Sequence, residues 1–239
     1  MKQSFYTCLF LLISVVSTAQ NSLVFDANAE LRNVAAFTKI EVANGIQLYL
    51  TQGKDRAVAV SAAEEQYIGK IKTEVSNGTL SITVENGNWG GWNWGNKKIK
   101  AYVSVTQLEK LSFSGGSVGK IVDSISVVDL RSSLSGGSIL NGNFTGTNVT
   151  ITLSGGSIAT IAGKLNSISV DVNGGSIFKG TNLKVNDVTI DASGGSVVSV
   201  IAEKQLTVDA SGGSVINYSG DAVVKTNASS GGSVIRKKN

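Results

Sequence analysis

A short glycine motif recurs along the second half of the chain and strongly limits the folds open to it. Gly-Gly-Ser occurs seven times at spacings of 18 to 21 residues, and a serine or, once, an asparagine precedes each glycine pair. The first glycines of the seven copies are Gly115, Gly136, Gly155, Gly174, Gly194, Gly212 and Gly231. A near-constant period of about 20 residues is typical of solenoid proteins, in which each repeat forms one coil.

In the four copies from Gly155 to Gly212 the residues before the glycine pair alternate between apolar and polar. In one copy Ile168, Val170 and Val172 are separated by Ser169 and Asp171. A period of two is typical of a strand with one buried face. A unit of this size has no core of its own, but parallel stacking buries the apolar positions of each unit on the next. We therefore expect an all-β fold whose residues 110–239 form a parallel β-helix, or β-solenoid, of about seven coils.

The region before the repeats, residues 34–109, has a different pattern. Asn44-Gly45 and Asn77-Gly78 each lie between two alternating segments. This dipeptide is the strongest short-range signal for an antiparallel hairpin. We expect antiparallel β-structure here, with one short helix over 62–68, and we expect it to cap the otherwise open edge of the first coil.

The N-terminus, residues 1–19, has the features of a secretory signal peptide. Lys2 precedes an apolar run over 9–16, and small residues follow up to Ala19. The run is too short to span a bilayer, and we find no other candidate span. We therefore expect an exported protein, in the periplasm or on the outer cell surface, whose mature chain starts with a lead-in over residues 20–33.

The composition excludes several classes of function. The chain has no histidine, and its single cysteine, Cys8, lies in the expected signal peptide. Ser-His-Asp catalysis and imidazole metal ligands are therefore absent, and the mature chain forms no disulfide. The 21 basic and 17 acidic residues give a mild net charge of +4 without a nucleic-acid-binding motif. We predict no catalytic residue, no cofactor and no nucleic-acid partner.

The three tryptophans, Trp89, Trp92 and Trp94, lie together in a segment rich in glycine and asparagine. Aromatic rings on an exposed loop stack on sugars or anchor a protein partner at a small cost in entropy. The alternative is that the rings fold back and seal the end of the solenoid, since soluble proteins rarely expose large apolar patches. We predict a ligand-binding site at these tryptophans.

Three aspartates, Asp171, Asp191 and Asp209, occupy the same outward position of successive repeats, three residues before the first glycine. Stacked coils would place these carboxylates roughly 5 Å apart. Such a row is a candidate calcium site, or a candidate acid pair of a carbohydrate-active enzyme. The simpler interpretation is a row of solvated charges.

The chain also resembles a known family, the bacterial putative autotransporter adhesins with a "head GIN" domain. The resemblance rests on residues 37–48, 75–80 and 103–116 and extends over nearly all of the mature chain. It implies a β-helical domain exported to the bacterial envelope, and the family name implies adhesion, without any catalytic or binding residues. We therefore predict a non-enzymatic binding or adhesion scaffold with a glycan or cell-surface partner. The alternatives are a carbohydrate-active enzyme that uses the aspartate row and a purely structural envelope protein.

Overall fold

The structure is a computed structural model that describes residue 26 and residues 28–85 and 98–238. The predicted signal peptide lies outside these residues. The N-terminal strands are β1 (Glu30–Leu31), β2 (Lys39–Val42), β3 (Gln47–Gln52), β4 (Ala57–Ser61), β5 (Ile71–Ser76), β6 (Thr79–Val84), β7 (Lys100–Val105) and β8 (Lys110–Phe113). The later strands are β9 (Val118–Leu134), β10 (Ile139–Leu153), β11 (Ile158–Val172), β12 (Ile177–Ala192), β13 (Val197–Ala210), β14 (Val215–Ser219), β15 (Val223–Ser229) and β16 (Val234–Lys237).

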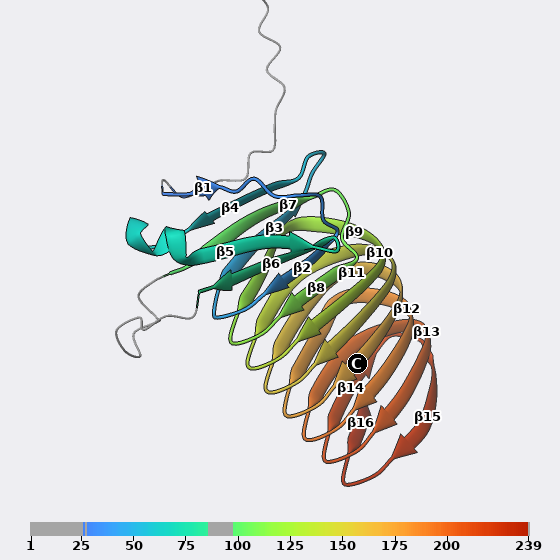
Figure 1. Cartoon of the computed structure of the whole chain (residues 1–239). Coiled ribbons are helices and arrows are strands. Elements are labelled where there is room, and N and C mark those ends of the chain that lie inside the picture. The colour runs from blue at the N-terminus through green and yellow to red at the C-terminus, as the bar shows by residue number, and fades with distance from the viewer. Residues whose placement is uncertain (1–25, 27, 86–97, 239) are drawn as a thin grey trace, which may run out of the picture.

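The repeats form the predicted parallel β-solenoid. Strands β9 to β13 each follow most of one coil and stack side by side along a rod (Figure 1). Ile151, Val170, Ile190 and Val208 are aligned partners on successive coils, and each is at most 1% exposed. The period-two pattern therefore predicted the inward positions correctly. No helix in the described part of the chain is long and apolar enough to span a membrane.

The glycine pairs form the corners of the coils. In the sixth corner Gly212 and Gly213 have φ values of +60° and +76°, which favour glycine over other residues. A Cβ atom on Gly212 would lie 2.8 Å from the backbone nitrogen of Gly194 in the preceding coil, whereas a Cβ atom on Gly213 would meet open space. The first glycine is thus required by its φ angle and by close stacking, and the second by its φ angle alone.

The serine after each glycine pair points into the core. The six serines of coils one to six are fully buried: Ser117, Ser138, Ser157, Ser176, Ser196 and Ser214. Ser138 Oγ donates a hydrogen bond of 2.7 Å to the carbonyl of Ser135 in its own corner. Ser214 Oγ donates one of 3.2 Å to Ala192 in the preceding coil. A buried hydroxyl with such a partner avoids the desolvation penalty of about 1–3 kcal/mol.

At the N-terminal end the spatial order of the coils differs from their order in the sequence. Strand β2 pairs in parallel with β6 on one side and β8 on the other. Strand β3 pairs in parallel with β7 and β9. The coil formed by β2 and β3 therefore lies between the coil of β6 and β7 and the first glycine repeat (Figure 1). Parallel stacking continues without a break across residue 109.

The predicted hairpin at Asn44-Gly45 is wrong. Strands β2 and β3 do not pair with each other but with strands above and below them, and Asn44-Gly45 is a solenoid corner. Asn44 and Gly45 have φ values of 63° and 71°, and a Cβ atom on Gly115 would lie 3.3 Å from the Asn44 nitrogen. The same two-residue turn closes a hairpin or turns a coil, and the partner strands decide which one forms.

The antiparallel cap is confirmed elsewhere in this region. Strands β5 and β6 form the hairpin predicted at Asn77-Gly78, and β4 pairs antiparallel with β7 and β1. A 3-10 helix over Glu65–Lys70 overlaps the expected short helix, and its Ile68 is 5% exposed. These elements cover the outermost coil at the N-terminal end of the rod (Figure 1).

Candidate functional site

The predicted binding residues Trp89, Trp92 and Trp94 lie outside the described residues. Their segment joins β6 to β7. The end of β6 and the start of β7 lie on the side of the rod where later coils have their glycine corners. The ligand-binding role of the tryptophans stays a prediction.

The three aspartates are aligned as the repeat predicts. Asp171 is the register partner of Asp191, and Asp191 is the partner of Asp209. Asp171 and Asp191 are exposed and Asp209 is partly buried. Among the described residues, no group of three acidic or cysteine side chains has an arrangement suited to a metal ion. A cation at this row, which we call the aspartate row, stays a prediction.

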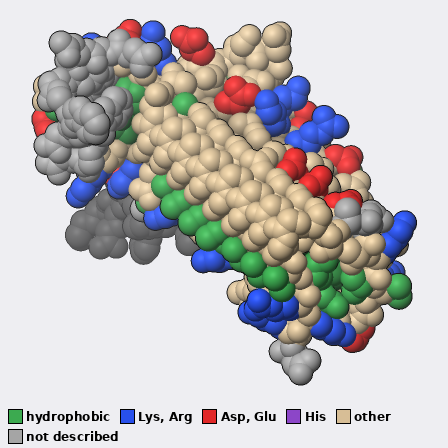
Figure 2. Space-filling model, turned by 90° about the horizontal axis from the view of Figure 1, so that it is seen from below, with side chains coloured by type: hydrophobic (Ala, Val, Ile, Leu, Met, Phe, Trp, Pro, Cys, Tyr) green, Lys and Arg blue, Asp and Glu red, His purple; other side chains and the backbone are tan. Residues whose placement is uncertain are grey.

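A row of aliphatic side chains runs along the outer surface just after the glycine corners. Each member follows the buried serine of its coil, points outward and is partly buried. We call it the apolar row: Val118, Ile139, Ile158, Ile177, Val197, Val215 and Val234. Figure 2 shows a line of hydrophobic side chains along the rod, beside a broad band of backbone and polar atoms. An aliphatic row of seven members is thus accessible over the length of the repeats.

A second outward row lies two residues further along the same strands. We call it the polar row: Lys120, Asn141, Thr160, Lys179, Ser199, Asn217 and Arg236. Ser199 and Asn217 are partly buried, and the other members are exposed. A cation therefore occurs at every third coil, and neither row contains an acidic residue. Figure 2 shows basic side chains beyond the hydrophobic line, and both acidic and basic side chains across the polar band.

Two stacked tyrosines stand at the N-terminal end of the polar row. Tyr49 aligns with Lys120 on one side and with Tyr102 on the other. The two rings are 5.2 Å apart at an angle of 15°, and Lys120 Nζ lies 5.4 Å from the Tyr49 ring centroid. A cation over an aromatic ring is attracted by the ring's quadrupole. Tyr49 therefore helps to position Lys120, and Tyr102 supports Tyr49.

A polar cluster at Asp26 attaches the N-terminal lead-in to this end of the rod. Lys100 Nζ and Ser61 Oγ both lie 2.9 Å from Asp26 Oδ2. The hydrogen bond from Lys100 lowers the pKa of the Asp26 carboxyl, and the same bond raises the pKa of Lys100. Burial raises the pKa of Tyr102, which is 5% exposed. The cluster therefore connects segments that are far apart in the sequence.

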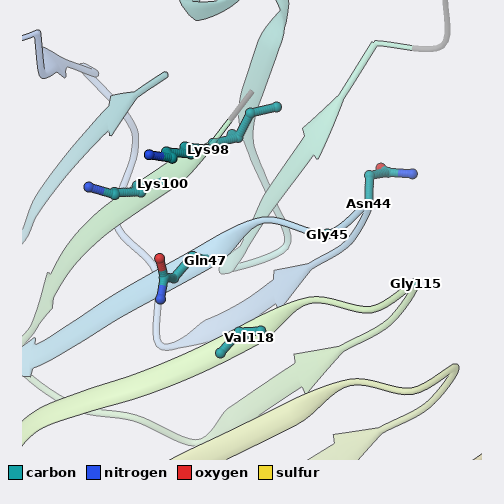
Figure 3. A pocket seen from close by; sticks show the side chains of 8 residues that line it. Asn44, Gly45, Gln47, Lys98, Lys100, Gly115 and Val118 are labelled. Carbon is teal, nitrogen blue, oxygen red and sulfur yellow. The ribbon is translucent and has the colours of Figure 1, made fainter. Parts of the chain in front are cut away.

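Three of the larger hollows in the described part of the chain lie in the N-terminal half of the rod. One of about 640 Å³ is lined by Lys98, Lys100, Gln47 and the corners at Gly45 and Gly115, and Figure 3 shows both lysines extending in the same direction. A second, of about 560 Å³, is lined mainly by β3, β9 and β10, with Tyr49, Lys120 and Asn141 among its residues. The third, of about 1040 Å³, lies beside β8 and β9. None of the three is lined by a residue of the aspartate row.

The sequence contained a signal for the apolar row, but the row was not predicted. The residue after the serine of the motif is valine or isoleucine in all seven copies. Because side chains alternate along a strand, the burial of the serine directs the next residue outward.

The fold and the two rows can now be compared with known proteins. A family model described as "Putative auto-transporter adhesin, head GIN domain" matches residues 36–222. The chain belongs to this family. The match spans the N-terminal coils as well as most of the glycine repeats, so the head GIN domain here includes both, and the expected family is confirmed. No curated protein matches the chain.

Solved structures show the same fold at low sequence identity. A putative adhesin from Bacteroides fragilis is 18% identical, with a TM-score of 0.79 over 88% of this chain and 96% of the other. A putative adhesin from Parabacteroides distasonis is 16% identical, with a TM-score of 0.71 over 88% and 96%. A putative lipid binding protein from the same species is 19% identical, with a TM-score of 0.66 over 90% and 98%. These similarities show the same solenoid fold in proteins that share less than 20% of their sequence with this chain.

Proposed function

We propose that this head GIN protein is a non-enzymatic, adhesin-type binding scaffold that is exported to the bacterial cell envelope. The observation that carries the proposal is the accessible face formed by the apolar and polar rows. Parallel stacking holds seven aliphatic and seven polar side chains in fixed register along one side of a rod. A surface of this kind offers a long preformed area of contact, which lowers the entropic cost of binding. The adhesin names of the family and of two structural neighbours support the same role.

We further propose that the ligand is a glycan and that Trp89, Trp92 and Trp94 contact it. Their segment precedes Lys98 and Ile99 in the sequence, and these two residues line the hollow of about 640 Å³. Aromatic rings bury a large area against the apolar face of a sugar, and neighbouring amides and lysines bind its hydroxyl groups. The tryptophans would thus extend the binding surface at the N-terminal end of the rod.

A glycan array with purified residues 20–239 tests this function. We expect binding to a restricted set of glycans and loss of part of that binding when the three tryptophans are replaced by alanine. The melting temperature, measured by circular dichroism, serves as the folding control, because lost binding with unchanged melting indicates direct contact. A variant that loses stability but retains binding would show that the tryptophans seal the solenoid instead. No binding to any glycan or cell surface would contradict the adhesin-type function itself.

A further inference from the structure

The apolar and polar rows together form a straight track along the rod. They arise from the same strands two residues apart, so both follow the axis with the strand spacing of about 4.8 Å. Seven coils give a track roughly 30 Å long. The valines and isoleucines are short and partly buried, whereas the lysines and arginine beside them are long and exposed. The track therefore has an apolar floor with polar and cationic groups along one edge.

The charges of the track favour an anionic occupant. Lys120, Lys179 and Arg236 recur at every third coil of the polar row, separated by asparagine, threonine and serine. Neither row contains an acidic residue; Asp123 lines the hollow beside Tyr49, and the exposed Glu203 and Asp221 each follow a member of the polar row by four residues. The aspartate row lies on the strands that lead into the glycine corners, whereas the track lies on the strands that leave them, so these three carboxylates are not part of the track.

The shape of the track favours a linear polymer over a lipid surface. A membrane-bound surface inserts its apolar side chains several ångströms below the headgroups, which requires side chains that protrude. The members of the apolar row are instead partly buried, and the cations beside them are exposed. A polysaccharide chain fits such a floor, because each pyranose ring has an apolar face of C–H groups and a rim of hydroxyls, and each unit advances by about one strand spacing.

From these observations we propose that the apolar and polar rows bind a linear acidic polysaccharide that lies along the rod axis. The apolar row contacts the C–H faces of successive sugars. The amides and hydroxyls of the polar row bind sugar hydroxyls, and its three cations pair with carboxylates of the polymer. Tyr49 acts as a positioning residue, since its ring holds Lys120 at the start of the track. The proposal rests on the glycan-binding function above but assigns the acidic ligand to a surface separate from the tryptophans.

The test uses polygalacturonate oligomers as the acidic probe and dextran oligomers of equal length as the neutral probe, with purified residues 20–239. Calorimetry measures affinity for the wild type and for the combined variant Lys120→Gln, Lys179→Gln and Arg236→Gln. The matched control, Lys164→Gln, Lys184→Gln and Lys204→Gln, removes three exposed cations roughly midway between glycine pairs. We expect the track variant to bind polygalacturonate about tenfold or more weakly, and the control to bind like the wild type.

Two further measurements separate the track from general charge attraction. Affinity for polygalacturonate should rise with oligomer length until the chain is about as long as the track. Ile158→Asn combined with Ile177→Asn should weaken binding several-fold with the charge unchanged, and a melting curve verifies that the variant folds. If the contact were purely electrostatic, this variant would bind polygalacturonate as tightly as the wild type. That result would overturn the role of the apolar row.

Three results would overturn the proposal as a whole. These are equal losses in the track variant and its control, equal affinity for dextran and polygalacturonate, and binding to phosphatidylglycerol vesicles without binding to polygalacturonate. If the glycan array shows tryptophan-dependent binding of neutral glycans while polygalacturonate does not bind, the track proposal fails and the adhesin-type function remains.

Discussion

Replacement of Ile190 by aspartate is expected to unfold much of the solenoid, whereas replacement of its neighbour Thr189 is expected to be tolerated. Ile190 is 0% exposed and is stacked between Val170 and Val208 on the adjacent coils, which are 1% and 0% exposed. Thr189 is exposed on the opposite face of the same strand. The two substitutions thus add the same charge one residue apart, once inside the rod and once in solvent.

The magnitudes follow from these two environments. Truncation of a buried isoleucine costs about 2–5 kcal/mol, and an unpaired carboxylate among aliphatic side chains adds several kcal/mol or forces its own protonation. Ile190→Asp therefore costs about 5 kcal/mol or more, which is comparable to the whole stability of a typical domain, about 5–15 kcal/mol. Thr189→Asp places a carboxylate between the exposed Asp187 and Asp191, where screened repulsion costs about 1 kcal/mol or less.

Urea unfolding followed by circular dichroism measures both free energies. Thr189→Lys is the matched control, because it removes the same threonine without adding to the negative charge of Asp187 and Asp191. We expect it to be as stable as the wild type. Similar losses of unfolding free energy for Ile190→Asp and Thr189→Asp would refute the assignment of inward and outward positions.

Further predictions concern single features of the rod. Ser132 is 3% exposed, and its Oγ has no hydrogen-bond partner among the described residues, so Ser132→Ala should raise the unfolding free energy by about 1–3 kcal/mol in urea. A loss of stability would mean that the hydroxyl is satisfied. Gly212→Ala should lower the melting temperature more than Gly213→Ala, because both need φ near +60° to +76° but only Gly212 also meets the preceding coil; equal shifts would contradict the close stacking. The pKa of Asp26 is lowered from 3.8 in the fold, so its contribution to stability is present above that pH and is lost as pH falls through the folded pKa. Asp26→Asn should therefore melt below the wild type at neutral pH and converge with it in acid, and a constant difference at all pH values would exclude the carboxylate as the cause. If the aspartate row binds calcium, added calcium should raise the melting temperature of the wild type and not that of a variant with all three aspartates replaced by asparagine; no shift in the wild type would leave the row as solvated charge.

The repeat made the solenoid predictable because the period holds over seven copies and the alternation over most of them. In the middle copies the positions six, four and two residues before the glycine pair predicted inward side chains such as Ile168, Val170 and Val172, and the structure buries them. Ser132 occupies one of these inward positions, and its burial follows from the stacking of its neighbours. A solenoid of this kind is specified by many weak and consistent local signals.

The N-terminal coils were harder to predict because their partners are distant in the sequence. Asn44-Gly45 has the local signature of a hairpin, but β2 is bounded by β6 and β8, which begin about 40 and 70 residues later. The preference of Asn-Gly for positive φ angles determines the turn, but it does not determine which strands pair with β2 and β3. The Asn77-Gly78 hairpin was predicted correctly because both of its strands are adjacent in the sequence.

The candidate site was only partly accessible from the sequence. The aspartate row followed directly from the repeat, and its register is confirmed. The polar row was not recognised, because its members are lysine, asparagine, threonine, serine and arginine and share no residue type. Only the pairing of the strands shows that Lys120, Lys179 and Arg236 are aligned along one line of the rod.

If the protein is an adhesin, attachment of living cells depends on it. Cells of the source bacterium, a strain lacking this gene, and the deletion strain complemented with wild type, track variant or control variant are compared on polygalacturonate-coated surfaces. We expect that deletion reduces attachment, that the wild type and the control with Lys164, Lys184 and Lys204 replaced restore it, and that the variant with Lys120, Lys179 and Arg236 replaced does not. Attachment of the deletion strain at the wild-type level would contradict an adhesive role for this protein on such surfaces.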